Sequence, residues 1–489
     1  MFTDRRARSR LPCAFPTQCT FTRQLQMRRI KRSFSRSSGG LLGSLVVILS
    51  SNAAIAILTL GTFALTSQAL SPAGLGLLVL IEAYGRMFDQ VLRLEPSQAL
   101  IRMGMPHRDR AHELPFRRLV KFGFLLDAGG SVLAAAAALA CLPLLSGWFG
   151  FDAEVQPLVV LYCLTFLLPA PMTVTALFRL FGRFGLYARV TVLASVFRLV
   201  MTGVLFLAGG DLTAFVLLLC AVSCLERLLP VFYCWPLLRQ RVGSGLIGTP
   251  LAGVTQEGGG LWRFIMASNL NVLARNSTRQ FDIAALGGFV SPAELSFYVL
   301  AKRFAMLVIR LGSPVQLVLY PRMCELMARH DLGHLLRFVF ASVAMLLGLG
   351  LCGVGLVALV GQPLVAFAFG PEYVAALPNI LVQLAGACLF LIGKIFGSAL
   401  QTVGRVGQLT AVSIITAAVF FIPIPLVVPH YGVIAASYLG LLSGLAFLGI
   451  CALVFARAVI ALRRGTAEPG RAVEPQSDEG EAFVEKQFS

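Results

Sequence analysis

The chain has 489 residues, of which 57% are hydrophobic and 13% are charged, and its mean hydropathy is +0.81. These values lie outside the range of soluble globular domains and exclude that class. The formal net charge of +18 accompanies long apolar segments, so we expect it to face anionic lipid headgroups rather than a nucleic acid. The composition therefore predicts an integral membrane protein that contacts anionic membrane lipids.

Apolar segments of about 20 residues, the length that crosses a bilayer, recur along the chain and predict an all-α polytopic protein. We expect a basic segment at 1 to 40, a first half at 41 to 238, a linker at 239 to 260, a second half at 261 to 457 and an acidic, disordered tail at 458 to 489. About twelve transmembrane helices are predicted, at 41 to 66, 73 to 92, 119 to 146, 157 to 178, 186 to 208, 212 to 235, 261 to 289, 294 to 320, 336 to 360, 374 to 402, 406 to 428 and 432 to 456.

The distribution of Lys and Arg predicts the orientation, because short loops rich in these residues stay on the cytoplasmic side. Residues 1 to 36 contain ten Lys or Arg and one Asp, and every second loop after them is also basic. The loops near 67 to 72, 147 to 156, 209 to 211, 290 to 293, 361 to 373 and 429 to 431 contain no Lys or Arg. Both termini are therefore predicted to be cytoplasmic.

Polar residues interrupt the seventh and eighth spans. Ser268, Asn271, Arg275, Arg279 and Asp282 follow one another at spacings of three, four, four and three residues, which places them on one helix face. The eighth span adds Lys302, Arg303 and Arg310. A cation at the bilayer centre costs roughly 2.5 to 3.5 kcal/mol, so these side chains should face an interior cavity. Their excess over the single acid Asp282 predicts a cationic half-cavity for an anionic substrate, although Arg310 could instead extend to the headgroups.

The second span gives a different pattern. Glu82, Arg86, Asp89 and Arg93 alternate in sign at helical spacing, which favours pairing within the helix over substrate binding.

The eleven cysteines are scattered and lack a CxxC spacing, and His330 and His334 have no third ligand nearby. No metal site is predicted.

An internal repeat relates the two halves at an offset of about 220 residues. The segment "LSPAGLGLLVL" at 70 to 80 matches "VSPAELSFYVL" at 290 to 300, and Phe149-Gly150 matches Phe369-Gly370. "LFRLFGRFG" at 177 to 185 falls on "ALQTVGRVG" at 399 to 407, and "SN" at 51 recurs at 268. Six spans per half predict a parallel repeat about an axis along the membrane normal, an arrangement typical of transporters.

The chain resembles the polysaccharide or O-antigen flippases of the Wzx type, which belong to the same superfamily as the MATE exporters and the lipid II flippases. The resemblance lies in residues 70 to 104, in "ALFRLFGRFGLYA" at 176 to 188, in residues 282 to 304 with "YPRM" at 320 to 323, and in "FGPEYVAALPNILVQL" at 369 to 384. It covers nearly all of residues 41 to 457. Gly182 departs from the pattern, because the family often has Asp there.

The resemblance implies a MATE-like fold and the movement of a polyprenyl-diphosphate-linked glycan across the bacterial inner membrane, for lipopolysaccharide, capsule or exopolysaccharide. It also implies coupling of transport to H⁺ or Na⁺ and contact with other polysaccharide assembly proteins. It implies neither an enzymatic activity nor a cofactor. The expected substrate-binding residues are Arg275, Arg279, Arg303, Lys302, Asn271 and Arg198, and the ion-coupling candidates are Asp282, Glu82 and Asp89.

Two other functions compete with this one. A MATE-like, ion-coupled exporter of small cationic molecules would share the architecture but would need carboxylates and aromatic side chains in the membrane. An enzyme of glycan assembly would need catalytic groups in a large loop, whereas the predicted extracytoplasmic loops hold only about 3 to 15 residues.

Overall fold

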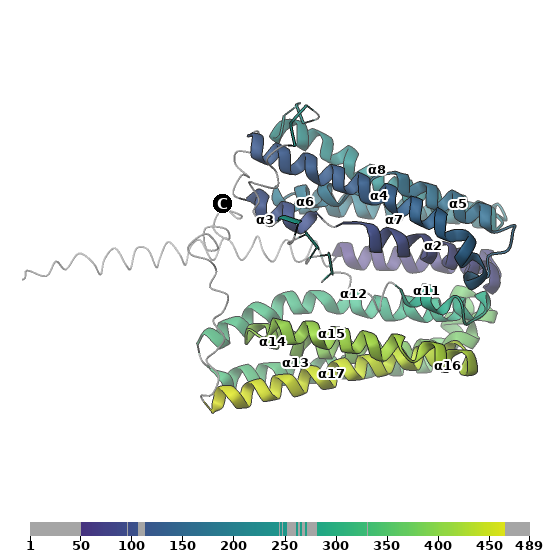
Figure 1. The fold of residues 1–489 in the computed structure, drawn as a ribbon. Coiled ribbons are helices and arrows are strands. Elements are labelled where there is room, and N and C mark those ends of the chain that lie inside the picture. The colour runs from purple at the N-terminus through teal and green to yellow at the C-terminus, as the bar shows by residue number, and fades with distance from the viewer. Residues whose placement is uncertain are drawn as a thin grey trace, which may run out of the picture.

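The computed structural model describes residues 50 to 464 except for 95, 106 to 112, 244, 247, 252 to 260, 263 to 264, 267 to 268, 271 to 280 and 330. Within these residues the chain forms helices and no strand. The helices make two bundles that lie one above the other in Figure 1, called here the first half and the second half.

The first half begins with the helix Ser50–Ala69. It continues with α2 (Pro72–Leu92), α3 (Ser97–Gly104), α4 (Leu114–Phe149), α5 (Gln156–Leu164), η2 (Thr165–Leu167), α6 (Met172–Leu180), α7 (Phe184–Leu207) and α8 (Leu212–Arg241). The second half contains α11 (Asp282–Leu286), α12 (Pro292–Ala328), α13 (Leu332–Phe369), η3 (Pro371–Ala376), α14 (Leu377–Thr402), α15 (Val406–Phe421), α16 (Ile424–Tyr431) and α17 (Val433–Arg463).

The helices are those of an integral membrane protein. Eight of them in the described chain are long and apolar enough to cross a bilayer, and a bent pair brings the number to as many as nine. The charged helices α2 and α12, which match the second and eighth predicted spans, are not among these. Residues 263 to 264, 267 to 268 and 271 to 280 of the seventh predicted span lie outside the described residues.

The fourth predicted span, 157 to 178, differs from the expectation of one continuous helix. Gln156–Leu167 and Met172–Leu180 meet at a bend of 41°, and the sequence between them holds Pro169 and Pro171, which lack a backbone N–H group. Helices α4 and α8 satisfy the freed backbone groups. The hydroxyl of Ser131 accepts a hydrogen bond from Ala170 N (3.0 Å), Asp127 accepts one from Thr173 N (2.8 Å), and Arg227 donates to Leu168 O (2.8 Å).

The predicted repeat is visible in the way matching helices begin and end. Ser71 and Ser291 both cap a helix whose next residue is proline. Gly150 and Gly370 end α4 and α13 with φ values of 64° and 107°, and Gly182 and Gly404 adopt φ values of 68° and 83° in the two "GR" turns. Glycine reaches this left-handed region without steric cost. The structure therefore repeats its turns as well as its residues.

A hydrophobic core joins the two halves at the end of the predicted extracytoplasmic loops. The shared core contains Tyr84 and Phe149 from the first half and Phe369 and Phe420 from the second. α2 crosses α12 there so closely that a Cβ atom on Gly76 would lie 1.8 Å from the carbonyl oxygen of Pro292. Gln68 also donates a hydrogen bond to Ala368 O (2.8 Å).

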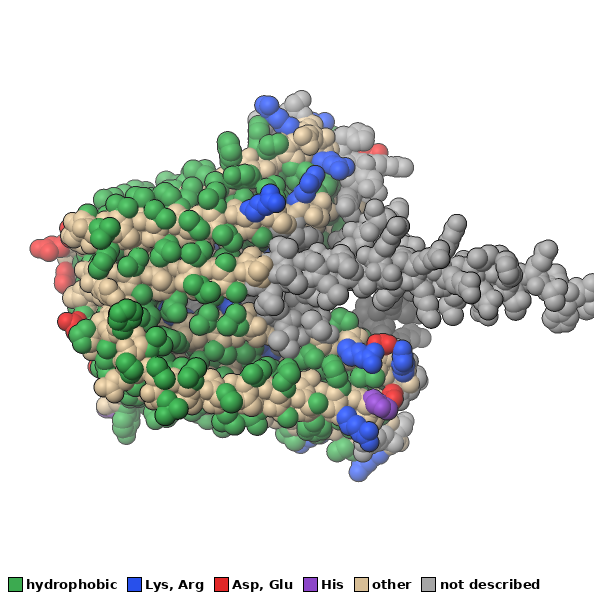
Figure 2. Space-filling model, turned by 180° about the vertical axis from the view of Figure 1, so that it is seen from behind, with side chains coloured by type: hydrophobic (Ala, Val, Ile, Leu, Met, Phe, Trp, Pro, Cys, Tyr) green, Lys and Arg blue, Asp and Glu red, His purple; other side chains and the backbone are tan. Residues whose placement is uncertain are grey.

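At the opposite end each half has its own core. One cluster, which includes Phe116 and Phe178, belongs to the first half, and another, which includes Phe396 and Phe455, belongs to the second. The bundles diverge toward this end in Figure 1. Most of the Lys and Arg in Figure 2 gather at this end, and Asp and Glu mark the closed end.

The predicted starts of the linker and of the tail fall inside observed helices. α8 continues to Arg241 and α17 to Arg463, so regular helix enters the residues assigned to the linker and to the tail. The rest of those two segments is mostly outside the described residues, as is the N-terminal basic segment. The division therefore stays a prediction.

Candidate functional site

A cleft of about 440 Å³ lies between the halves and is called here the central cleft. The helix Ser50–Ala69, α2, α7 and α8 line it from the first half, and α12 lines it from the second. Its charged lining consists of Glu82, Arg86, Arg198, Glu226, Lys302, Arg303 and Arg310. Five cations and two acids line the cleft. Lys302 is also paired with Asp282, which lies outside the lining, so the surplus over the described acids is +2.

Glu82 is the acid at the centre of this lining. Its side chain is 12% exposed, and it pairs with Arg86 at 2.9 Å and with Arg198 at 3.9 Å. The contact with Arg86 is one of the two pairs expected within the second span. The other joins Asp89 to Arg93 at 3.1 Å, so the predicted pairing is confirmed.

Arg303 and Arg310 lie seven residues apart on α12, which puts them on one helix face. The guanidinium carbon of Arg303 lies 5.4 Å from the ring centroid of Phe63, a geometry that stabilises a cation through the ring quadrupole. Neither arginine forms an ion pair with a carboxylate of the described chain. Their donors therefore have no protein anion to satisfy them in this part of the structure.

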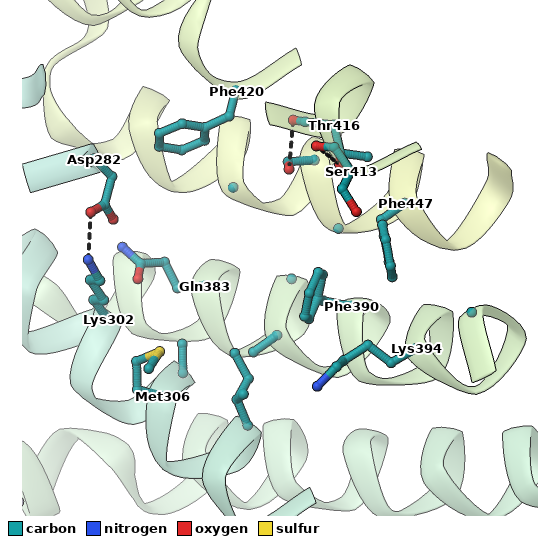
Figure 3. A pocket seen from close by; sticks show the side chains of 18 of the residues that line it. Asp282, Lys302, Met306, Gln383, Phe390, Lys394, Ser413, Thr416, Phe420 and Phe447 are labelled. Atoms are coloured by element: carbon teal, nitrogen blue, oxygen red, sulfur yellow. Dashed lines mark hydrogen bonds and ion pairs between the residues drawn. The ribbon is translucent and has the colours of Figure 1, made fainter. Parts of the chain in front are cut away.

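A larger cavity of about 800 Å³ lies within the second half, between α12, α14, α15 and α17, and is called here the second-half cavity. Asp282 stands at one end of it and binds Lys302 Nζ (2.6 Å) and the hydroxyl of Tyr298 (2.9 Å). Figure 3 shows this pair at one end, with Phe390, Phe447 and Lys394 farther along. Lys302 and Met306 line both cavities, so the two spaces adjoin across these residues.

The structure brings several of the expected site residues together. Arg198, Lys302, Arg303 and Glu82 line the central cleft, and Asp282 lines the second-half cavity. Asp89 lines neither of these two cavities, since it is buried between Arg93 and Arg227. Asn271, Arg275 and Arg279 lie outside the described residues.

Three charged lining residues were not among the expected site residues. Arg86 was assigned to pairing within its helix, and for Arg310 both a cavity and the headgroups were left open, yet both line the cleft. Glu226 was not considered. Its signal was present in the sequence, because adjacent charges at 226 and 227 interrupt an otherwise apolar span and a charge in such a position normally faces the protein interior.

Comparison with solved structures gives the fold. A multidrug resistance MATE family transporter of the MOP superfamily, in an inward-facing conformation, matches with a TM-score of 0.64 over 86% of this chain and 100% of its own, at 14% identity. The chain has the MATE fold. The lipid II flippase MurJ, in an inward closed conformation, also has this fold and matches with a TM-score of 0.56 over 92% of this chain and 96% of its own, at 10% identity.

Comparison by sequence finds a relative that is described as an inner membrane protein. The inner membrane protein YghQ of Escherichia coli (strain K12) is 24% identical over 339 residues, which is 67% of this chain and 92% of that protein. No protein-family model matches the chain. The evidence for the MATE fold is therefore similarity of structure, and the evidence for a substrate is the lining of the central cleft.

Proposed function

We propose that the chain is a flippase that moves a polyprenyl-diphosphate-linked oligosaccharide from the cytoplasmic to the periplasmic leaflet of the bacterial inner membrane. The observation that carries this proposal is the surplus of positive charge in the lining of the central cleft, where Arg303 and Arg310 form no ion pair with a carboxylate of the described residues. Cations gathered between two membrane-embedded halves require an anion to compensate them.

A diphosphate matches this lining in geometry as well as in charge. The planar guanidinium group donates two parallel hydrogen bonds to neighbouring oxygens and stays charged where water is scarce. Arg86, Arg198 and Arg303 present three such groups around one space, with Glu82 between them. Lys302 adds a fourth cation. We expect Arg275 and Arg279 to extend this lining.

The relatives agree with transport of a lipid-linked substrate rather than with catalysis. One protein with the same fold is described as a lipid II flippase. The positive-inside pattern further supports a cleft that opens to the cytoplasm, where lipid-linked glycans would enter it. We propose that H⁺ or Na⁺ drives the cycle through Glu82 or Asp282, and that other assembly proteins act on the product.

The same fold also serves multidrug transporters, so export of small organic cations is the second candidate. The lining of the central cleft argues against it, because five cations would repel a cationic substrate and only two acids are there to attract it. The residue pattern of the cleft therefore favours the anionic substrate.

The proposal is tested by following a labelled undecaprenyl-diphosphate-linked glycan in proteoliposomes with an impermeant glycan-oxidising reagent. We expect the purified protein to accelerate movement between leaflets. Arg303→Ala should slow it at least about tenfold, because a hydrogen bond to a charged group contributes about 1.5–3 kcal/mol, and Arg303→Lys should restore only part of the rate.

Arg239→Ala is the matched control. Arg239 is exposed at the end of α8, where it lies over Trp235 at 5.3 Å and outside the central cleft. Its removal should leave the rate unchanged. If folded wild-type protein does not accelerate the glycan, with or without an ion gradient, but does move a cationic dye, the flippase proposal is wrong and the exporter takes its place.

A further inference from the structure

The second-half cavity has a lining unlike that of the central cleft. Its described lining holds one acid, Asp282, and two cations, Lys302 and Lys394. Asp282 and Lys302 neutralise each other at 2.6 Å. The rest of the lining is aromatic, hydroxyl, amide, small or aliphatic, and the aliphatic part includes Met306, Ile309 and Leu409. The cavity therefore offers hydrogen bonds and apolar faces where the cleft offers charge.

Aromatic side chains form a platform in this cavity. Phe390 on α14 and Phe447 on α17 stack with their ring centroids 4.8 Å apart and their planes at 30°. Lys394 lies on the same platform, with Nζ 5.9 Å from the ring centroid of Phe390. Figure 3 shows these three side chains beside one another along the cavity. Flat apolar faces beside a charged donor suit a ligand that has both C–H faces and polar groups.

Hydroxyl groups line the opposite wall and present acceptor oxygens. Ser413 and Thr416 on α15 donate their protons to the carbonyl oxygens of Leu409 (3.0 Å) and Val412 (2.9 Å), and Ser443 donates to Thr416 O (3.2 Å). A hydroxyl that has donated its proton keeps lone pairs for an incoming donor. The hydroxyl oxygens of this wall can therefore accept hydrogen bonds from a ligand rich in O–H groups.

One amide extends the same pattern toward Asp282. Gln383 Nε2 donates to Ser437 Oγ (3.2 Å) and to Tyr298 O (3.3 Å). These contacts hold the amide in place with its donors occupied, so the carbonyl oxygen is the atom that remains for a ligand. Figure 3 shows Gln383 between the Asp282–Lys302 pair and the aromatic platform.

The length and the lining of the second-half cavity argue against a single ion and against a hydrocarbon chain as its ligand. Its lining runs from Tyr298 to Tyr320 on α12, which is about 33 Å at 1.5 Å per residue. A single bound ion does not need such a space, and the one acid is already paired. A hydrocarbon chain would make no use of the acceptor oxygens that these hydroxyl and amide groups present.

We propose that the second-half cavity is the binding site for the glycan of the lipid-linked substrate, while the central cleft holds the diphosphate. The inference rests on the proposed function, because Lys302 and Met306 place the cavity directly beside the cationic lining. Sugar rings supply C–H faces for Phe390 and Phe447 and hydroxyl groups for Gln383, Ser413 and Thr416. These residues then determine which oligosaccharide the protein accepts.

The test compares two probes on the purified full-length protein. One is undecaprenyl diphosphate, and the other is the undecaprenyl-diphosphate-linked glycan extracted from the bacterium that carries this chain. We expect the wild-type protein to bind the glycan-bearing lipid at least about tenfold more tightly. Phe390→Ala should reduce this preference about five- to tenfold, as loss of an aromatic contact predicts, and leave the affinity for undecaprenyl diphosphate unchanged.

Two variants control for folding and for ring loss. Phe340→Ala removes a phenylalanine that is 59% exposed on α13 and lines neither cavity, and it should change neither affinity. Phe390→Tyr keeps the ring and should keep the preference. If Phe390→Ala does not fold, Ser413→Leu, which adds bulk to the hydroxyl wall of the cavity, takes its place with the same expected result.

Each outcome bears on a separate statement. Equal affinity of the wild-type protein for the two lipids would overturn the glycan site and leave the flippase standing. Equal losses for both lipids in Phe390→Ala would mean that the cavity holds the shared polyprenyl chain or diphosphate, which also overturns it. Binding of neither lipid would overturn the proposed function and this inference together.

Discussion

At the scale of single residues, a deeply buried ion pair joins Asp89 of α2 to Arg227 of α8 at 2.9 Å, with each side chain 8% exposed. Arg227 also lies over Phe166 at 4.8 Å and donates to the broken fourth span at Leu168 O. This pair therefore joins three helices of the first half. This geometry favours a structural role for the pair, and the assignment of Asp89 as an ion-coupling candidate stays a prediction.

We expect Asp89→Leu to destabilise the protein by about 3–5 kcal/mol, because it leaves Arg227 buried without an anion. Melting in detergent measures this effect. Asp89→Leu combined with Arg227→Met should recover most of the stability, because a buried pair is replaced by apolar groups. Asp89→Leu with unchanged melting but no transport would instead assign Asp89 to ion coupling. Glu154→Gln in the exposed loop before α5 is the control.

The charges of the second span show how far sequence reasoning reaches at this scale. Helical spacing was sufficient to predict that Glu82 pairs with Arg86 and that Asp89 pairs with Arg93. It could not show that the first pair lines the cleft while Asp89 is buried against α8. That difference depends on which neighbouring helix presents a charge, and the neighbours of a helix come from tertiary packing.

At the scale of elements, the crossing of α2 and α12 closes one end of the cleft. The contact depends on Gly76, because any Cβ atom there would collide with the backbone of Pro292. Backbone cannot move aside as a flexible side chain can. A substitution at this position must therefore separate the two helices.

We expect Gly76→Ala to open the cleft at this end. A cysteine introduced at Ser195, which lines the cleft from α7, should then react faster with an impermeant thiol reagent added on the side of the loop 147 to 156. Gly147→Ala is the matched control, because a Cβ atom there would meet nothing within 4 Å. Equal labelling of the two glycine variants would show that α2 and α12 do not form the closure.

Hydropathy predicted the helices well but not their breaks. Apolar composition gave the positions of α7, α8 and α17 to within a few residues of their observed starts. The bend in the fourth span follows from Pro169 and Pro171 together with Ser131, Asp127 and Arg227, which come from other helices. Prolines are common in continuous membrane helices, so the sequence does not indicate which of them produce a break.

At the scale of the whole molecule, the repeat and the charge asymmetry of the loops were the strongest sequence signals. The repeat predicted the matching turns at Gly150 and Gly370, because a left-handed turn restricts the residue choice. It could not predict that the halves meet at one end and diverge at the other. That arrangement depends on how the two bundles pack against each other, and the residue pattern within either half does not contain this information.

The orientation leads to a prediction of its own. Asp152 lies in a loop at the closed end, and Arg241 ends α8 at the opposite end. Asp152→Cys should react with an impermeant thiol reagent added on the periplasmic side, and Arg241→Cys only with reagent added on the cytoplasmic side. Labelling of the wild-type protein measures the reaction of its native cysteines and is subtracted. The reverse pattern would invert the topology and with it the direction of transport.

The surplus of positive charge in the central cleft makes the empty protein sensitive to voltage. A cleft that is open to one compartment takes the electrical potential of that compartment, and a unit charge gains about 2.3 kcal/mol for each 100 mV that separates the two sides. With an interior-negative membrane and the predicted orientation, the positive lining favours a resting state that faces the cytoplasm. Under the proposed function, a bound diphosphate would cancel most of that charge and remove this bias, and the membrane potential would then return the emptied cleft for the next cycle.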